Sequence, residues 1–306
     1  MPVIDFDEPS SPIEDSTIEY PATAERPLLR VRTRCEGLTD RGLRRENNED
    51  NFLIARLTKR LDVCRSSFEH AGRSRFAEEI AHLLVVADGL GGAAAGERAS
   101  ELSISTIEDF VLNCFKWFLH FEPGEKDELV RELRDALRRA DHDVYQKARD
   151  DRSLMGMGTT LTMAYSVFGQ LYIAHAGDSR AYLLRGGTLR RLTRDHTYAQ
   201  MLLDAGEISP EDARRPGLRN VVTNVVGGPN EGVYVELHKL DLEDGDALLL
   251  CTDGLTEPVT EEDIAADLSR FDDPGGACRS LVERALKAGG PDNVAVVVAR
   301  FALDRG

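Results

Sequence analysis

Three apolar runs, each joined to an aspartate beside a flexible turn, constrain this chain more than any other feature. In the first run, residues 83–87 are all apolar and lead directly into Asp88-Gly89. The second run, 247–251, leads through one threonine to Asp253-Gly254, and Asp292 stands two residues before a third run. Short apolar runs of this kind are typical of strands buried on both faces. A lone Asp-Gly pair usually marks only a turn, but three carboxylates at strand ends can converge on one hard cation.

Length and charge limit what the chain can do. Its 306 residues, 42% of them apolar, are enough for one large domain or two small ones with a real core. The formal net charge of −16 argues against a nucleic acid or an anionic membrane as partner, since both require a basic surface. No apolar run approaches the roughly 18 residues of a membrane span. The sequence therefore predicts a protein with neither a nucleic-acid partner nor a membrane partner.

The amino-terminal segment indicates the domain organisation, and the cysteines indicate the compartment. Residues 1–25 contain seven acidic residues and no basic one. Such a segment buries too little surface to offset its ordering entropy, so we expect residues 1–27 to form a disordered acidic tail and 28–306 to form the folded domain. The five cysteines are scattered and include no C-x-x-C pair, which is typical of reduced thiols and a cytoplasmic protein.

The order of the expected elements indicates an α+β fold. Residues 56–81 are charged and irregular, and we expect a loop there. The short turns at 169–170, 177–179 and 186–187 predict antiparallel hairpins. The expected strands are 28–36, 51–55, 82–87, 159–168, 171–176, 180–184, 188–192, 233–238, 246–251 and 293–301. The expected helices are 97–121, 127–149, 197–205, 261–270 and 276–288. Strands grouped in this way favour antiparallel sheets over a repeated βαβ unit.

Other sites with familiar motifs are excluded by the residues present. Gly91 and Gly96 have the spacing of a phosphate-binding loop, but Glu97 and Arg98 stand where lysine and serine or threonine are required. A glutamate there would repel a phosphate. His175 and His196 are isolated in the sequence, and we expect structural roles for both. No nucleophile elbow, zinc motif or C-x-x-C pair is present.

The remaining chemistry is that of carboxylates. Asp, Glu and backbone carbonyl oxygens suit Mg²⁺ or Mn²⁺. Two such ions about 3.5–4 Å apart bind a water between them and lower its pKa from 15.7 toward neutrality. Arg45 can hold a phosphate through two parallel hydrogen bonds. The residues therefore point to metal-assisted hydrolysis of a phosphate ester.

Seven segments, in order along the chain, carry a family resemblance. They are 40–50 (D-x-G-x-x-R-x-x-N-E-D), 86–92 (VADGLGG), 156–160 (GMGTT), 177–180 (GDSR), 193–196 (T-x-D-H), 251–255 (CTDGL) and 292–293 (DN). Together they resemble the metal-dependent protein serine/threonine phosphatases, the PPM family of type 2C, and especially its compact bacterial branch. The resemblance runs from about Leu29 to Phe301.

The resemblance implies a fold and a dinuclear centre. The fold would be a four-layer α-β-β-α sandwich with two central antiparallel β-sheets and the metals at one end of the cleft between them. Asp88 would bridge two Mn²⁺ or Mg²⁺ ions, and Gly89 would give its backbone carbonyl, which the missing side chain leaves accessible. Asp253 and Asp292 would complete the shell of one ion.

The same resemblance assigns the neighbouring residues. Glu49 and Asp50 would serve the second ion or orient water bound to metal, and Arg45 would bind the phosphate. Asp178 would lie outside the direct ligands. The expected activity is hydrolysis of phosphoserine and phosphothreonine in proteins by a water or hydroxide activated at the two ions.

Two departures from the family pattern matter. Eukaryotic members often carry histidine two residues after the bridging aspartate as a general acid, whereas Leu90 stands there in this chain. The proton for the leaving group must then come from water or elsewhere. Bacterial members use an aspartate just before the Gly-Met-Gly segment for a third metal. Ser153, Leu154 and Met155 occupy the nearest positions here, so the sequence leaves open whether a third metal ion binds.

Two other classes of protein fit the sequence less well than a phosphatase. A catalytically silent phosphoprotein-binding relative would typically have lost a metal ligand, and this chain keeps every core acid. A calcium-stabilised module gains nothing from Arg45 beside Glu49 and Asp50. The expected partners are therefore phosphorylated proteins, either substrates of cytosolic serine/threonine kinases or the kinases themselves, and the expected state is a monomer.

Overall fold

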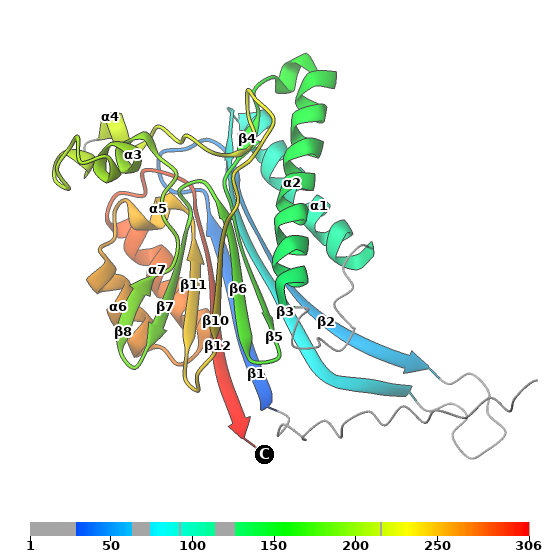
Figure 1. Cartoon of the computed structure of the whole chain (residues 1–306). Helices are drawn as coiled ribbons and strands as arrows, with labels where there is room; N and C mark the ends of the chain where they lie inside the picture. The colour runs from blue at the N-terminus through cyan, green and yellow to red at the C-terminus, as the bar shows by residue number, and fades with distance from the viewer. Residues whose placement is uncertain (1–28, 63–73, 92, 114–125, 215, 306) are drawn as a thin grey trace, which may run out of the picture.

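Two antiparallel sheets packed face to face form the centre of the protein, with helices on both outer sides (Figure 1). The computed structural model describes residues 29–62, 74–91, 93–113, 126–214 and 216–305. The expected tail, residues 1–27, lies outside the described residues. The predicted four-layer α-β-β-α arrangement is confirmed.

The first sheet has five strands in the order β1-β12-β11-β7-β8, and all neighbours are antiparallel. Its strands are β1 (Leu29–Asp40), β7 (Arg180–Arg185), β8 (Thr188–Arg191), β11 (Ala247–Cys251) and β12 (Val294–Arg305). The central strand β11 is buried along its whole length, as its unbroken apolar sequence predicts.

The second sheet has seven strands in the order β10-β6-β5-β3-β4-β9, and β2 pairs with β3 as well. Its strands are β2 (Asp50–Asp62), β3 (Ser74–Leu90), β4 (Gly158–Thr159), β5 (Leu161–Val167), β6 (Gln170–Ala176), β9 (Val226–Gly227) and β10 (Glu236–Asp241). Within the described residues, β10 is one edge of this sheet.

Two pairs of long helices cover the outer faces. The helices α1 (Ala93–Asn113) and α2 (Lys126–Asp150) pack on the second sheet, and α6 (Glu261–Arg270) and α7 (Pro274–Lys287) pack on the first (Figure 1). The shorter helices are η1 (Arg152–Leu154), α3 (Tyr198–Asp204), η2 (Asp212–Arg214), α4 (Pro216–Arg219) and α5 (Asp253–Thr256). None of the helices in the described residues is both long and apolar enough to cross a membrane.

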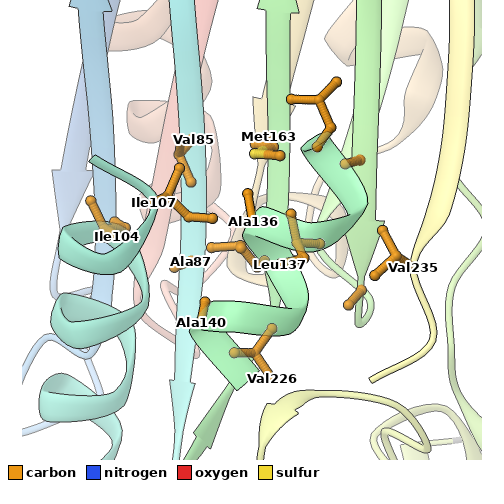
Figure 2. Packing of buried hydrophobic residues seen from close by; sticks show 14 of the residues in the cluster. Val85, Ala87, Ile104, Ile107, Ala136, Leu137, Ala140, Met163, Val226 and Val235 are labelled. Atoms are coloured by element: carbon orange, nitrogen blue, oxygen red, sulfur yellow. The ribbon is translucent and has the colours of Figure 1, made fainter. Parts of the chain in front are cut away.

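Three apolar cores correspond to the three interfaces between the four layers. One joins α1 and α2 to the second sheet, where Ile107 and Leu137 belong to the same cluster as the β3 residue Val85 (Figure 2). Another joins α6 and α7 to the first sheet. The third lies between the sheets, where Leu84 and Val86 of β3 belong to the same cluster as Leu250 of β11. Because β3 is buried on both faces, Asp88 at its end is held by two cores at once.

Two expectations about local structure are wrong. The loop expected at 56–81 is instead the outer part of a long hairpin, because β2 continues to Asp62 and β3 begins at Ser74; residues 63–73 lie outside the described part. The turn at 177–179 does not close a hairpin. It carries the chain from β6 in the second sheet to β7 in the first. The hairpins at 169–170 and 186–187 are confirmed.

Candidate active site

The ends of four strands bring the predicted acidic residues to one end of the sandwich. Asp50 begins β2 and lies directly opposite Asp88 in the register of β2 and β3. Asp253 begins α5 immediately after β11, and Asp292 precedes β12. Because β11 and β12 are neighbours in the first sheet, their two aspartates approach the pair on the second sheet.

Thr252 links the two sheets at this point. Its hydroxyl donates to Asp50 Oδ2 at 2.7 Å and accepts from the Ala295 amide at 2.8 Å. Thr252 is fully buried, and Asp50 is only 2% exposed. A buried hydroxyl with a fixed donor and acceptor holds the Asp50 carboxyl in one orientation.

The aspartates raise one another's pKa. Burial raises the pKa of Asp50 to about 8, and the charges of Asp253 and Asp292 add to the effect. Burial also raises the pKa of Asp253 to about 7 and that of Asp88 well above its usual range. After burial, the charges of Asp50 and Asp253 contribute most to the raised pKa of Asp88. Without a counter-charge, this cluster retains protons near neutral pH.

The donor atoms fit a hard cation. Asp50 Oδ1 and Asp253 Oδ1 are buried, and neither has a hydrogen-bond partner. A buried carboxylate oxygen left without a partner is costly, and a bound cation removes that cost. No group of three His, Cys, Asp or Glu side chains in the described part of the chain is already close enough to hold an ion. The fit therefore rests on the unpaired oxygens and on a donor set made of oxygen atoms alone.

Threonines of the 156–160 segment fix the backbone of Asp88. The amide of Thr160 and the hydroxyl of Thr159 both donate to the Asp88 carbonyl, at 2.9 and 2.8 Å. The Asp88 amide donates to Thr160 Oγ1 at 3.1 Å, and the same oxygen lies 2.7 Å from Ser179 Oγ. Three contacts thus determine where Asp88 sits. The segment was recognised in the sequence as a family motif, but no role was predicted for its threonines.

Gly89 is required for packing as well as for access to its carbonyl. A Cβ at Gly89 would lie 2.2 Å from the carbonyl oxygen of Gly96 in α1. That separation is impossible for real atoms, so a side chain here would push α1 off β3.

Arg45 lies beside Asp292 at the rim of the cluster. Its Nη2 is 2.6 Å from Asp292 Oδ2, and the Arg45 side chain is 56% exposed. The hydrogen bond with Asp292 raises the pKa of Arg45, and the charges of Glu49 and Asp88 act in the same direction. An exposed guanidinium held next to the acidic cluster can reach an incoming anion.

Asn293 holds the loop that carries Arg45, a role that sequence reasoning missed. Its Nδ2 donates to the carbonyls of Arg41 and Asn47, both at 2.8 Å, and its Oδ1 accepts from the Glu49 amide at 2.9 Å. One buried amide therefore ties both ends of the 41–49 loop to the first sheet. The adjacent Asp-Asn pair was a visible signal, but its target lay more than 240 positions away in the chain.

Glu49 and Asp178 lie at the margins of the cluster. Glu49 is half-buried, and burial raises its pKa while Arg45 lowers it. Asp178 is buried in the turn that passes between the sheets, and burial and the charge of Asp253 raise its pKa well above normal. All seven predicted site residues and Asp178 are thus gathered at one end of the sandwich.

The two histidines are not isolated in space. The rings of His175 and His196 lie 4.8 Å apart, and His196 Nε2 is 3.3 Å from Glu236 Oε2. His175 is buried against the Thr162 hydroxyl, and burial lowers its pKa to about 4. A neutral, hydrogen-bonded His175 fits the structural role expected for it.

The segment before Gly156, where bacterial relatives carry an aspartate for a third metal, forms the short helical turn η1 in this chain. Asp151 caps η1 by accepting from the amide and hydroxyl of Ser153, at 2.9 and 2.6 Å. Its carboxylate is exposed and already engaged.

This fold and this cluster of acidic residues define a class of protein, and comparison with known families agrees. Residues 70–288 match the family model described as "Protein phosphatase 2C". The chain belongs to this family of serine/threonine protein phosphatases.

Individual relatives show how far the likeness extends. The chain is 37% identical over 261 residues to the serine/threonine protein phosphatase PstP of Mycobacterium tuberculosis, covering 85% of this chain but 43% of that protein. It thus spans less than half the length of that relative. It is 32% identical to the serine/threonine phosphatase stp of Listeria welshimeri, covering 89% of this chain and 98% of the relative.

A solved structure is also similar. The catalytic domain of PstP in complex with two manganese ions aligns with a TM-score of 0.69 at 34% identity, covering 89% of this chain and 99% of that one.

Proposed function

We propose that this protein hydrolyses phosphoserine and phosphothreonine in proteins at a centre of two Mn²⁺ or Mg²⁺ ions. The observation that carries the proposal is the pair of buried, unpartnered oxygens, Asp50 Oδ1 and Asp253 Oδ1, beside the exposed guanidinium of Arg45. This arrangement offers sites for cations and a site for an anion within one cluster.

Each predicted residue then has a proposed task. Asp50, Asp88, Asp253 and Asp292 would hold the ions with their carboxylates, Gly89 with its carbonyl, and Glu49 through the second ion or its water. When bound, the ions supply Lewis-acid charge that lowers the pKa of water toward neutrality and offsets the charge of the phosphate. Asp178 lies outside the direct ligands, and a third ion stays open.

Phosphate binding depends on Arg45, and the proton for the leaving group is one that Leu90 cannot supply. Arg45 binds two phosphate oxygens through parallel N–H groups and holds the phosphorus in line for attack. Its contact with Asp292 keeps the guanidinium turned toward the cluster while the substrate is absent. Leu90 has no proton to give, so water protonates the departing serine or threonine oxygen.

The proposal extends to partners and location. The substrates are phosphorylated proteins, including cytosolic kinases or the proteins those kinases modify, and the protein acts as a monomer whose catalytic domain spans 28–306. The cytoplasm is the proposed compartment. The free thiols of Cys35, Cys251 and Cys278 support a reducing environment.

One assay tests the central claim. Turnover of a phosphothreonine peptide and of a small aryl phosphate is measured with Mn²⁺, with Mg²⁺, with Ca²⁺ and in excess chelator. We expect turnover with the first two ions and none in chelator. Full turnover in chelator would exclude the metal mechanism. Tight peptide binding without turnover would indicate a silent phosphoprotein-binding relative, and stabilisation by Ca²⁺ alone would indicate a structural module.

A further inference from the structure

We propose that the open edge of β10, together with the groove between it and α2, binds an extended acidic segment of the phosphoprotein substrate. We call this surface the β10–α2 groove. It is lined by Arg134 and Arg138 of α2 and by Gly232–Val235 and Leu237 of the other wall. The identity of the occupant rests on the proposed function, whereas the binding of an acidic strand does not.

The edge of β10 is free to pair. Within the described residues β10 pairs with β6 alone. The amide of Leu242 donates to the Gly169 carbonyl at 2.8 Å, which continues the same register. Because alternate residues of an antiparallel strand face one neighbour, Leu237, Lys239 and Asp241 direct their backbone N–H and C=O groups away from β6. The Asp241 carbonyl already accepts from Arg185 Nη2 at 2.8 Å, so the open part of the edge is Leu237 to Lys239. An open row of this kind is a template for an added strand.

The groove has the shape and lining that a strand needs. Its volume is about 620 Å³. Val233 and Val235 are almost fully buried and form an apolar floor, while the side chain of Tyr234 between them is 65% exposed. Leu137 of α2 and Val235 belong to the same apolar core (Figure 2), so the floor is attached to the helix. An added strand would place alternate side chains on this floor.

The charges along the groove select an acidic occupant. Arg134 and Arg138 are one helical turn apart on α2, and neither makes an ion pair or hydrogen bond with any residue that the structure describes. Their neighbour Arg139, in contrast, pairs with Asp143 at 3.2 Å. Lys239 is exposed on the same side of β10, with its Nζ 5.4 Å from the centre of the Tyr172 ring.

Among the residues that the structure describes, these three cations have no carboxylate partner, which is unexpected in a chain of net charge −16. A lysine on an edge strand can also serve only to prevent sheets from aggregating. That explanation does not account for the two unpaired arginines on the facing helix.

The segment 232–235, which faces α2 across the groove, is held in place before any partner binds. Asp141 of α2 is buried and accepts from the amides of Gly232 and Val233, at 2.8 and 3.2 Å. Asn224 makes a two-way contact with the backbone of Tyr234, donating to its carbonyl and accepting from its amide, both at 2.9 Å. A preformed wall reduces the entropy cost of binding.

The groove leads toward the acidic cluster. Glu236, the first residue of β10, contacts His196 through its carboxylate. The His196 amide donates to the Gly177 carbonyl at 2.7 Å, and Gly177 is next to Asp178. A strand on β10 therefore runs toward the site where Arg45 would hold the phosphate, which suits a segment of the substrate.

The protein's own amino terminus is a less suitable occupant. The described chain begins at β1, which packs against β2. In the second sheet β2 lies beyond β3, and β10 is at the opposite edge. The described chain thus begins on the side of the sandwich that is far from the groove.

The test compares two phosphopeptides. Both carry the same phosphothreonine joined by a Gly/Ser linker to a strand-forming arm, and the arm alternates valine with glutamate in one and with glutamine in the other. For the full-length protein with Mn²⁺, we expect a higher kcat/KM for the acidic arm at low salt. The double substitution Arg134→Glu, Arg138→Glu should lower that kcat/KM about tenfold and leave the glutamine peptide and an aryl phosphate unchanged.

A matched control and an edge variant separate charge from strand pairing. Arg279→Glu with Lys287→Glu on α7 changes the net charge equally and should have no effect on arm preference. Lys239→Gln removes the edge charge only, whereas Lys239→Pro also removes one outward N–H. If a strand is added, the proline variant binds the acidic arm several-fold more weakly than the glutamine variant, with the same melting temperature and aryl phosphate turnover.

Binding of the unphosphorylated acidic arm, measured by fluorescence anisotropy, needs no catalysis. This measurement tests the groove even if the protein proves inactive. Equal affinity for both arms, or equal losses in the α2 and α7 variants, would overturn the proposal. A synthetic peptide of residues 1–25 that competes more tightly than the substrate arm would also contradict it, because the groove would then belong to the amino terminus.

Discussion

At the scale of single residues, the aspartates of the acidic cluster were predictable and the residues that support them were not. Asp88 and Asp253 follow apolar runs in the sequence, so the end of a buried strand locates them without any knowledge of the fold. Thr160 and Thr252 carry no such mark. Their hydroxyls matter only because the fold brings Thr160 to Asp88 and Thr252 to Asp50, 202 positions away.

Replacing Arg45 tests the anion site. Arg45→Ala should raise the KM for a phosphopeptide by a factor of roughly 10 to 150, since hydrogen bonds to charged groups contribute ~1.5–3 kcal/mol. Arg44 is the control, because it is an exposed neighbour, and Arg44→Ala should leave KM unchanged. Steady-state kinetics at saturating Mn²⁺ measure both. An unaltered KM in the Arg45 variant would remove this residue from the phosphate site.

Replacing Asn293 tests the support of the Arg45 loop. Asn293→Ala removes three hydrogen bonds to the backbone of Arg41, Asn47 and Glu49, which contribute about 0.5–1.5 kcal/mol each. We expect faster amide hydrogen exchange in residues 41–49 and a raised KM, with little change in exchange in α7. Exchange rates in the loop equal to those of the wild type would show that Asn293 does not hold it.

At the scale of elements, periodicity located most strands and helices but not how they connect. The long hairpin of β2 and β3 was missed at 56–62 and 74–81 because the sequence there is charged and does not alternate regularly between apolar and polar residues. The turn at 177–179 is short enough for a hairpin. Only packing decides that β7 joins the other sheet, because its apolar residues complete a core with β11 and α6.

Substitution of Gly177 tests the importance of the turn that carries the chain from β6 to β7. It has a φ of +115°, and a Cβ there would lie 2.5 Å from Thr160 Cβ, the side chain that positions Asp88. Gly186 has a φ of +55° with open space around it, so it shares the strain and lacks the clash. Gly186→Ala should cost about 1–2 kcal/mol of stability, and Gly177→Ala clearly more, with a loss of turnover.

Urea unfolding and aryl phosphate kinetics measure the two effects. If the two alanine variants lost equal stability and kept equal turnover, the Gly177 contact with Thr160 would have no functional weight.

At the scale of the whole molecule, the layers follow from the burial of each strand. Strands apolar on both faces, such as β3 and β11, must lie inside, and amphipathic helices such as α2 must cover them. The order of the layers came from the family resemblance and is confirmed. Pairing between strands distant in sequence was not accessible: β1 and β12, for example, come from the two ends of the described chain.

The acidic cluster should make the metal-free protein less stable as pH rises. The pKa of Asp50 is raised from 3.8 to about 8 and that of Asp253 from 3.8 to about 7. For each carboxyl, the folded state therefore binds more protons than the unfolded state at pH values between 3.8 and the raised pKa. Stability then falls with rising pH, by roughly 1.4 kcal/mol per unit for each extra bound proton.

Thermal melts in chelator from pH 5 to pH 8.5 measure this dependence. The melting temperature should decrease across the range, and Asp50→Asn should flatten the curve because its side chain cannot titrate. A melting temperature that increases toward pH 8 would contradict the raised pKa values.

Cations should reverse this loss, and Asp88 separates a ligand role from a structural one. An ion at a hundred times its dissociation constant contributes ~2.7 kcal/mol, which corresponds to a rise in melting temperature of about 5–10 °C for a domain of this size. The rise should be larger at pH 8 than at pH 6, since the carboxylates repel one another most when ionised.

Asp88→Asn should abolish turnover and most of the metal-induced rise in melting temperature. Without metal, the variant should melt no lower than the wild type because one repelling charge is gone. Asp135→Asn, an exposed position on α2, is the control and should keep the full rise. If Asp88 were structural, the metal-free variant would melt well below the wild type, because a buried hydrogen-bond network would have been broken.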